Sequence, residues 1–236
     1  MPKANGLHHL AISTADIKKQ IEFFSDVLGM ELVALYWMHG VEGAFHGFLK
    51  LHDTASVAFV QTPENAKIKP QIGVSHAQNP TAPCAPGTMQ HVAFNVDTEA
   101  DLLAMRDRIR SRGIQIIGPL DHGFCKSIYF AGLENLSLEI STSSEPIDAR
   151  AWIDPEVVGL AGISASELER YKSPAAYAGK GGAVKQPPRD PAKPNQVWPD
   201  NFQVVFDWPD EKVTATLSQN EPPVKVADEA PVARSA

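Results

Sequence analysis

Two stretches of the sequence, Leu7-His8-His9-Leu10-Ala11-Ile12 and Met89-Gln90-His91-Val92-Ala93-Phe94, read alike and decide the fold. In each, a histidine is followed by an apolar residue, an alanine and a second apolar residue, which is the alternation of a strand with one face turned inward. His9 and His91 are 82 residues apart, and a segment with helical spacing of its apolar residues follows each strand. The pattern predicts an internal repeat whose units each begin with a strand and a helix.

Three short strand-like runs follow each predicted helix. In the first unit, strand 7–14 leads to a helix with Thr14 or Asp16 as its cap and Gly29 at its end. The later elements are strands 31–37, 44–51 and 56–61 in the first unit, and strand 88–96, helix 99–112 and strands 114–117, 127–130 and 136–141 in the second. We therefore predict one α+β domain over residues 6–143, built of two βαβββ modules at about 6–62 and 88–143.

The remainder, residues 144–236, has a different composition. It contains 12 of the 19 prolines, and a proline-rich stretch over 62–87 separates the two modules. Ser164 and Glu167 form a capping-box pattern that opens a short helix through about Tyr171. We expect a mostly irregular C-terminal extension whose last part, 221–236, is disordered.

Composition and charge exclude several classes of protein. The net charge of −7 and the lack of a Lys/Arg run argue against nucleic-acid binding. No apolar stretch reaches membrane length, and no secretory segment follows Met1. Two cysteines are too few for a disulfide framework, so we expect a cytoplasmic protein. A homodimer is the expected assembly, because closed twofold symmetry is the commonest.

Three side chains suggest a metal site. His9 and His91 occupy equivalent positions of the repeat, and Glu139 lies in the strand-like run Leu136-Ser137-Leu138-Glu139-Ile140. An unpaired carboxylate on the inward face of a strand is costly, which favours a ligand role for Glu139. Two imidazoles and one carboxylate are the set that holds a non-haem iron while leaving positions open for other ligands.

These motifs resemble the vicinal oxygen chelate superfamily, which includes glyoxalases, extradiol ring-cleaving dioxygenases and fosfomycin-resistance proteins. The resemblance covers about residues 6–143 and rests on the two histidine strands and three further strings. They are Ile21-Glu22-Phe23-Phe24-Ser25-Asp26-Val27-Leu28-Gly29-Met30, Asp121-His122-Gly123-Phe124-Cys125-Lys126-Ser127-Ile128-Tyr129-Phe130 and Leu138-Glu139-Ile140. It is specific for the fold and implies that the two modules form an open barrel. It is much less specific for the reaction, because this fold hosts several chemistries.

The number of metal ligands separates the branches of the superfamily. Glyoxalases use four protein ligands, whereas extradiol enzymes use three. The first-module counterpart of Glu139 is Ala58 or Val60, depending on register, and neither can bind a metal. Gln61 would reach the site only through a register slip that turns its side chain to the opposite face. The resemblance therefore implies the dioxygenase branch.

The resemblance also implies roles for residues near the metal. Tyr129, 10 residues before Glu139, would bind a catechol oxygen; His122 would lie near substrate or oxygen; and His76 could be the acid/base histidine. His8 should point to the opposite face from His9. The turn before the last strand, Ala131-Gly132-Leu133-Glu134-Asn135, departs from the usual Asp-Pro-x-Gly-Asn.

The expected function is an Fe(II)-dependent extradiol-type dioxygenase that acts on a small catechol-like aromatic compound and O₂. One alternative is a glyoxalase-type isomerase or lyase with Zn(II), Ni(II) or Mn(II), which would need a fourth ligand. Another is a non-catalytic protein that binds a small molecule. Oxygen consumption separates the two enzyme classes, and stoichiometric metal separates both from the binding protein.

Overall fold

The structure, a computed structural model, describes residues 3–225. Residues 3–38 and 43–176 form one compact unit, and residues 39–42 and 177–225 belong to a second unit. Part of the segment expected to be disordered, residues 226–236, lies outside the described residues. No helix in the described range is long and apolar enough to cross a membrane.

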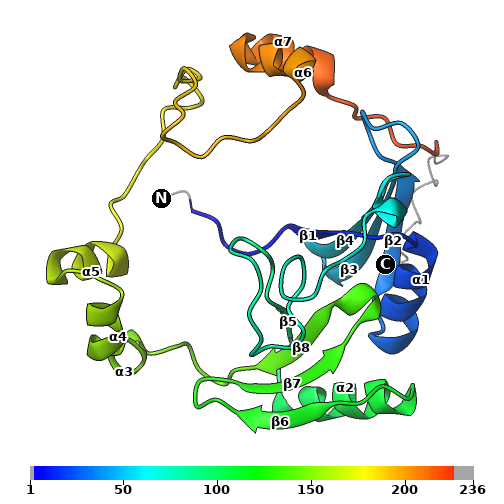
Figure 1. The fold of residues 1–236 in the computed structure, drawn as a ribbon, viewed down its shortest axis with the longest axis vertical. Coiled ribbons are helices and arrows are strands. Elements are labelled where there is room, and N and C mark those ends of the chain that lie inside the picture. The colour runs from blue at the N-terminus through cyan, green and yellow to red at the C-terminus, as the bar shows by residue number, and fades with distance from the viewer. Residues whose placement is uncertain (1–2, 226–236) are drawn as a thin grey trace, which may run out of the picture. The chain divides into compact units, whose positions relative to one another are not determined.

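Eight strands of the first unit form two four-stranded sheets with the same order (Figure 1). In each sheet, the first and last strands of the module pair in parallel at one edge, and the remaining pairs are antiparallel. The chain is therefore an α+β protein built from two βαβββ modules. The first sheet contains β1 (His9–Ser13), β4 (Ala55–Gln61), β3 (Phe45–His52) and β2 (Glu31–Trp37). The second contains β5 (Val92–Asn95), β8 (Ser137–Thr142), β7 (Lys126–Ala131) and β6 (Ile117–Asp121).

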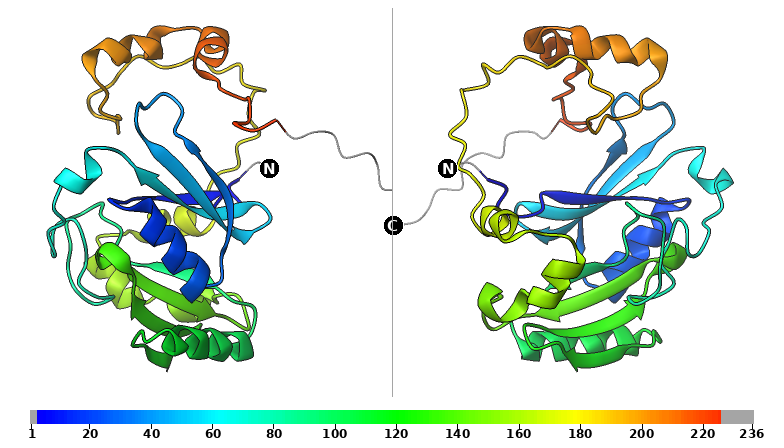
Figure 2. Two further views of the ribbon diagram at one scale, coloured as in Figure 1. Left: turned by 90° about the vertical axis from the view of Figure 1, so that its right-hand side faces the viewer. Right: turned by 60° about the vertical axis from the view of Figure 1, so that its left-hand side comes forward.

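One helix accompanies each sheet. In module one, α1 (Ile17–Glu22) continues as a π-helical turn over Phe23–Val27, and Asp16 caps it by accepting a hydrogen bond from the Lys19 amide. In module two, α2 (Glu99–Ser111) is capped by Thr98 and lies along one face of the second sheet (Figure 2). Gly29 and Gly113, with φ of 80° each, follow these helices, as expected.

A continuous core joins the two modules. The Phe24 ring is fully buried and contacts Phe59 of module one, with centroids 4.9 Å apart, and Phe94 of module two, at 6.3 Å. Arg108 of α2 also donates hydrogen bonds to the carbonyls of Val27, Ser25 and Asp26 at the end of the first helix. The apolar faces of both sheets are therefore buried in one core, and their opposite faces remain for the site.

Two predicted strands differ from the observed ones. Strand 114–117 was predicted, but β6 begins only at Ile117 and runs through Gly118-Pro119 to Asp121, so residues 114–116 are not strand. Pro119 lies where the β6–β7 register shifts, on an edge strand, and a proline without an N–H is tolerated there. Strand 88–96 is shorter than expected: β5 begins at Val92, which pairs with Leu138, and ends at Asn95.

The turn before β8 connects the modules through an unusual glutamate. Glu134 and Asn135 have positive φ values of 53° and 62°. The Glu134 carboxylate accepts hydrogen bonds from the Ala15 amide at 2.8 Å and from the buried Gln20 side chain at 2.9 Å. In the usual Asp-Pro-x-Gly-Asn turn, a glycine occupies this position. Here Glu134 occupies it, and its side chain reaches module one.

Glu134→Gly should destabilise the protein by about 1–2 kcal/mol. Relief of the left-handed strain gains about 1 kcal/mol, but two hydrogen bonds to a charged group are lost and buried Gln20 keeps no partner for its amide. Asn135→Gly is the matched control, because it relieves similar strain without touching module one. Denaturant unfolding measures both; a larger loss for Asn135→Gly would contradict the role of the carboxylate.

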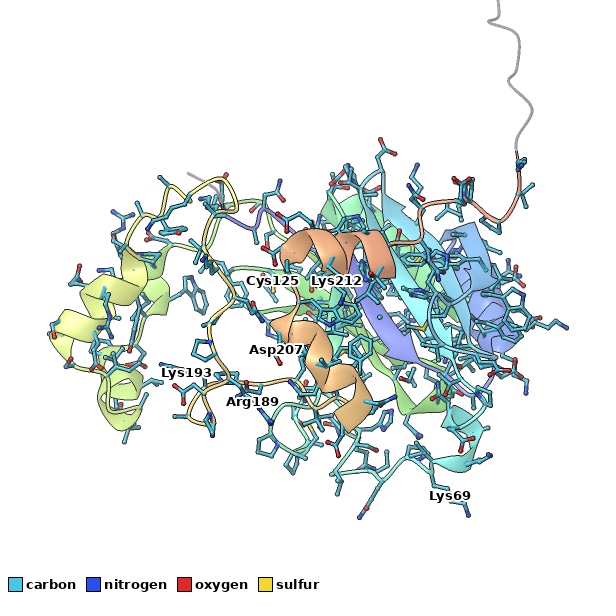
Figure 3. All side chains as sticks on the ribbon, turned by 90° about the horizontal axis from the view of Figure 1, so that it is seen from above. Lys69, Cys125, Arg189, Lys193, Asp207 and Lys212 are labelled. Atoms are coloured by element: carbon cyan, nitrogen blue, oxygen red, sulfur yellow. The ribbon has the colours of Figure 1, made fainter. Side chains whose placement is uncertain are left out.

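The C-terminal extension contains more helix than predicted. Its helices are α3 (Ala149–Trp152), α4 (Pro155–Leu160), α5 (Ala165–Lys172), α6 (Asp200–Gln203), the 3₁₀ turn Val204–Asp207 and α7 (Asp210–Leu217). The capping box of Ser164 and Glu167 is confirmed at the start of α5. In the second unit, Arg189, Lys193 and Asp207 help to line a cavity of about 850 Å³ (Figure 3).

Candidate metal centre

The strand register fixes which positions of the two modules correspond. Ala11 lies opposite Ala58 in the β1–β4 pair, and Ala93 lies opposite Glu139 in the β5–β8 pair. Because Ala11 and Ala93 each follow their histidine by two residues, the counterpart of Glu139 is Ala58 and not Val60. The Gln61 side chain accepts a hydrogen bond from the Ile17 amide and so faces α1, away from the site.

His91 and Glu139 meet on the face of the second sheet that is turned away from the core. His91 directly precedes β5, and its Nε2 lies 2.8 Å from Oε2 of Glu139. Glu139 is only 5% exposed. Burial by itself raises the pKa of this carboxyl group, but hydrogen bonds from Ser127, Ser141 and Tyr129 and the nearby His91 outweigh it, and the net pKa is lowered. The carboxylate is therefore held in the charged form that a metal requires.

Hydrogen bonds orient both of these side chains. The Ser141 hydroxyl donates to Oε1 of Glu139 and lies 2.8 Å from the Ser127 hydroxyl. The Gln90 amide nitrogen donates to the carbonyls of Asn79 (2.9 Å) and Ala82, so its Oε1 accepts from Nδ1 of His91. With Nδ1 holding the proton that Gln90 accepts, Nε2 is the ring nitrogen that a metal would bind.

Sequence reasoning did not identify these supporting residues. Ser127 and Ser141 could have been found from strand alternation, because they share the face of Tyr129 and Glu139. Gln90 offers no comparable signal, since its role depends on where residues 62–87 place the carbonyls of Asn79 and Ala82.

We expect Gln90→Leu to weaken metal binding by about 10- to 100-fold, the usual cost of losing a partner that orients a metal-ligating histidine. Fe(II) or Zn(II) titration against a chelator measures the affinity, and the exposed Gln219→Leu serves as the control. Equal affinities for the two variants would contradict the orienting role.

His9 has a similar environment in module one. It begins β1, and its ring centroid lies 5.7 Å from that of Phe48, just as the His91 ring lies 6.3 Å from Tyr129. Phe48 and Tyr129 are counterparts, because they pair with Ala58 and Glu139 respectively. Within the described range, the structure does not gather three or more His, Cys, Asp or Glu side chains into a metal-binding group. His91 and Glu139 are thus in contact, and His9 lies on the other sheet.

His8 does not follow the expected alternation. The strand begins only at His9, so the rule that neighbouring side chains point to opposite faces does not govern His8. Nδ1 of His8 instead lies 2.9 Å from Nδ1 of His9, and the two rings meet edge to face.

Tyr129 and His122 form the second part of the candidate site. Tyr129 lies directly opposite Glu139 in the β7–β8 ladder, and its hydroxyl is 2.9 Å from Nε2 of His122. Burial raises the pKa of Tyr129, and the Glu139 charge adds to this effect. A continuous path of contacts therefore runs from His91 through Glu139 and Tyr129 to His122.

His76 stays within the loop that joins the modules. It is half-buried, and its ring Nδ1 lies 2.9 Å from the Ser75 hydroxyl while its carbonyl accepts from Gly73. A cavity of about 790 Å³ begins nearby at Gln78–Pro80 and reaches Tyr129. His91 and Glu139 are not among its lining residues, so this cavity adjoins the candidate site rather than containing it.

In module one, aromatic side chains cover the face of the sheet that carries Ala58. The Phe48 ring lies parallel to Tyr36, with centroids 6.2 Å apart, and its centroid is 4.4 Å from that of His46. Cross-strand pairing places Phe48 opposite the buried Ala58. The position that carries a carboxylate in module two thus carries a methyl group beside aromatic rings in module one.

Comparison with known proteins agrees with this architecture. The family model of the Glyoxalase/Bleomycin resistance protein/Dioxygenase superfamily matches residues 6–140. Biphenyl-2,3-diol 1,2-dioxygenase 2 of Rhodococcus globerulus is 27% identical over 154 residues, which cover 64% of this chain and 71% of that protein.

Two solved structures also resemble the chain. One is a glyoxylase/bleomycin resistance protein/dioxygenase domain from Frankia sp. EAN1pec, with 13% identity, a TM-score of 0.47 and coverage of 60% of this chain and 99% of that one. The other is TnmS3, an antibiotic-binding protein from Streptomyces sp. CB03234, with 16% identity, a TM-score of 0.43 and coverage of 61% and 100%. Likeness at these levels says nothing about the reaction.

Proposed function

Because the chain belongs to the Glyoxalase/Bleomycin resistance protein/Dioxygenase superfamily, we propose that it is an Fe(II)-dependent, extradiol-type dioxygenase of a catechol-like aromatic compound. The observation that carries this proposal is the path of contacts from His91 through Glu139 and Tyr129 to His122. It combines metal-ligand chemistry with two groups that can bind and move a proton. The similarity to a biphenyl-2,3-diol dioxygenase supports the same class of substrate.

The donor set fits a divalent metal. The ionised, buried Glu139 and the Nε2 of His91 already face each other at 2.8 Å, and His9 would provide the third ligand from the equivalent position of module one. Bound Fe(II) would supply Lewis acidity toward the two catechol oxygens and a path for electrons to O₂. Ala58 leaves the fourth protein position empty of donors, which keeps room for an exogenous ligand.

The remaining residues would handle the substrate and its protons. The Tyr129 hydroxyl, held by His122, would donate a hydrogen bond to a substrate oxygen. Nε2 of His122 lies close enough to that hydroxyl to accept and return a proton through it. We keep His76 as a further candidate for proton transfer, although its described contacts lie in the connecting loop.

The aromatic rings of module one suit a flat apolar substrate. Tyr36, His46 and Phe48 are half-buried side chains on the face of the first sheet that carries Ala58, the counterpart of Glu139. Aromatic rings bind one another through stacked and edge-to-face contacts, each worth about 0.5–1.5 kcal/mol beyond burial. This surface favours an aromatic substrate over a small aliphatic one.

Anaerobic reconstitution with Fe(II), followed by oxygen-electrode and absorbance assays with a panel of catechols, tests the proposal. We expect oxygen uptake together with a new yellow ring-fission product. Bound metal without oxygen uptake for any catechol would favour an isomerase or lyase that uses Zn(II), Ni(II) or Mn(II). A chain that binds no metal would favour a small-molecule binding protein.

Tyr129→Phe should bind metal normally and turn over about 10- to 100-fold more slowly, because one orienting hydrogen bond and its proton path are removed. Steady-state oxygen uptake measures kcat, and metal analysis confirms the loaded fraction. Tyr171→Phe, on the exposed helix α5, is the control. Wild-type kcat across several catechols would contradict the role of Tyr129.

A further inference from the structure

The turn that carries His122 connects β6 to β7. Within it, the His122 amide donates to the Cys125 carbonyl at 2.8 Å, and the Gly123 amide donates to the Asp121 carboxylate at 2.8 Å. The His122 ring is exposed, yet its Nε2 lies on the Tyr129 hydroxyl. The position of this ring therefore depends on the backbone of residues 121–125.

A tryptophan from the C-terminal extension packs against this turn. The Phe124 and Trp152 rings meet edge to face, with centroids 4.8 Å apart and an interplanar angle of 81°. Gly123 has φ of +85°, and a Cβ atom placed on it would lie 2.8 Å from the Trp152 ring. The positive φ favours glycine at position 123, and a side chain there would meet the indole and displace it.

Trp152 belongs to a short helix that closely follows the strand of Glu139 in the sequence. It ends α3, in which the Asp148 carboxylate accepts a hydrogen bond from the Arg150 amide and binds the Arg150 guanidinium with nitrogen–oxygen distances of 2.6–3.1 Å. The chain passes from the end of β8 at Thr142 to Trp152 in 10 residues. One short segment therefore links the strand that carries Glu139 to the turn that carries His122.

We propose that Trp152 is a positioning residue that fixes the turn 121–125 and so keeps Nε2 of His122 on the Tyr129 hydroxyl. The indole covers Gly123 and contacts Phe124, the two residues that follow His122. The consequence for turnover rests on the proposed dioxygenase function; the effect on the His122 ring does not. The extension would then contribute to the site although it lies outside the two modules.

Trp152→Ala and Gly123→Asn test this contact from its two sides. Asparagine tolerates a positive φ, so its main effect at position 123 is to displace the indole. Trp152→Phe should restore much of the packing, and Tyr171→Ala in the same extension is the control. All variants are studied in the full-length chain.

The first readout is the ¹⁵N chemical shifts of the His122 ring in the metal-free protein, assigned by comparison with His122→Asn. Wild type and Trp152→Phe should show one hydrogen-bonded state, whereas Trp152→Ala and Gly123→Asn should shift toward solvent-averaged values. Combining the two changes should have no additional effect, because both remove one contact. Wild-type shifts in both single variants would overturn the proposal.

The second readout is kinetic. For the iron-loaded protein, we expect kcat about 3- to 10-fold lower in Trp152→Ala, the factor expected from one aromatic contact, with KM and metal content unchanged. An unchanged kcat alongside altered ring shifts would overturn the catalytic consequence. If even the wild type consumes no oxygen, the dioxygenase proposal fails, while the ring shifts still decide whether Trp152 positions His122.

Discussion

Glu139→Ala should abolish stoichiometric metal binding and lower turnover by about 10³-fold or more, well beyond the cost of losing an outer hydrogen-bond partner. The carboxylate is buried, lies 2.8 Å from His91 and has its pKa lowered by hydrogen bonds from the serines and the tyrosine around it. Its removal leaves one imidazole in module two and no negative charge to offset the metal. Metal analysis and oxygen uptake measure the two effects.

Two further variants separate loss of the ligand from loss of the fold. Glu139→Gln keeps the shape and can still accept from Ser141, but it lacks the charge; we expect it to fold and to bind metal poorly. Glu145→Ala, at an exposed position just after β8, should behave as wild type. Stoichiometric metal in both Glu139 variants would remove this residue from the site.

Phe24→Ala should lower the free energy of unfolding by about 3–5 kcal/mol, the usual range for truncating a buried phenylalanine. Its ring is fully buried between Phe59 of module one and Phe94 of module two. The cavity would therefore open between the modules rather than within one of them. Denaturant unfolding followed by circular dichroism measures the loss.

Phe24 also bears on the metal site, because the two histidines belong to different modules. We expect the folded Phe24→Ala protein to bind metal more weakly than wild type, even though residue 24 contacts no ligand. Trp37→Ala is the matched control, since this ring is 64% exposed on an edge strand. Wild-type metal affinity in the folded Phe24→Ala protein would contradict the bridging role of Phe24.

The repeat itself could be predicted from the sequence because alternation and helix-stop signals are local. His9 and His91 marked the first strands, and Gly29 and Gly113 marked the helix ends. The error at β6 had a physical origin: Gly118-Pro119 reads as a break, but an edge strand tolerates a residue without an N–H. Whether a strand lies at an edge depends on the order of strands, which local patterns do not contain.

The candidate site could be predicted only in part, for a related reason. Sequence comparison between the modules left Ala58 and Val60 as alternative counterparts of Glu139, and only the observed pairing decides for Ala58. Gln90, Glu134 and Trp152 act through partners that are distant in sequence or set by loop conformation. Their contacts could not be derived from residue types and spacing.

The difference between Ala58 and its counterpart Glu139 breaks the symmetry of the two modules. A scaffold with a carboxylate at both positions would present nearly equivalent halves to a bound molecule. Here one half presents negative charge and hydroxyl groups, and the other presents a methyl group and the rings of Phe48 and Tyr36. A bound molecule with one polar and one apolar edge would have a single preferred orientation, so the duplicated scaffold can impose regioselectivity.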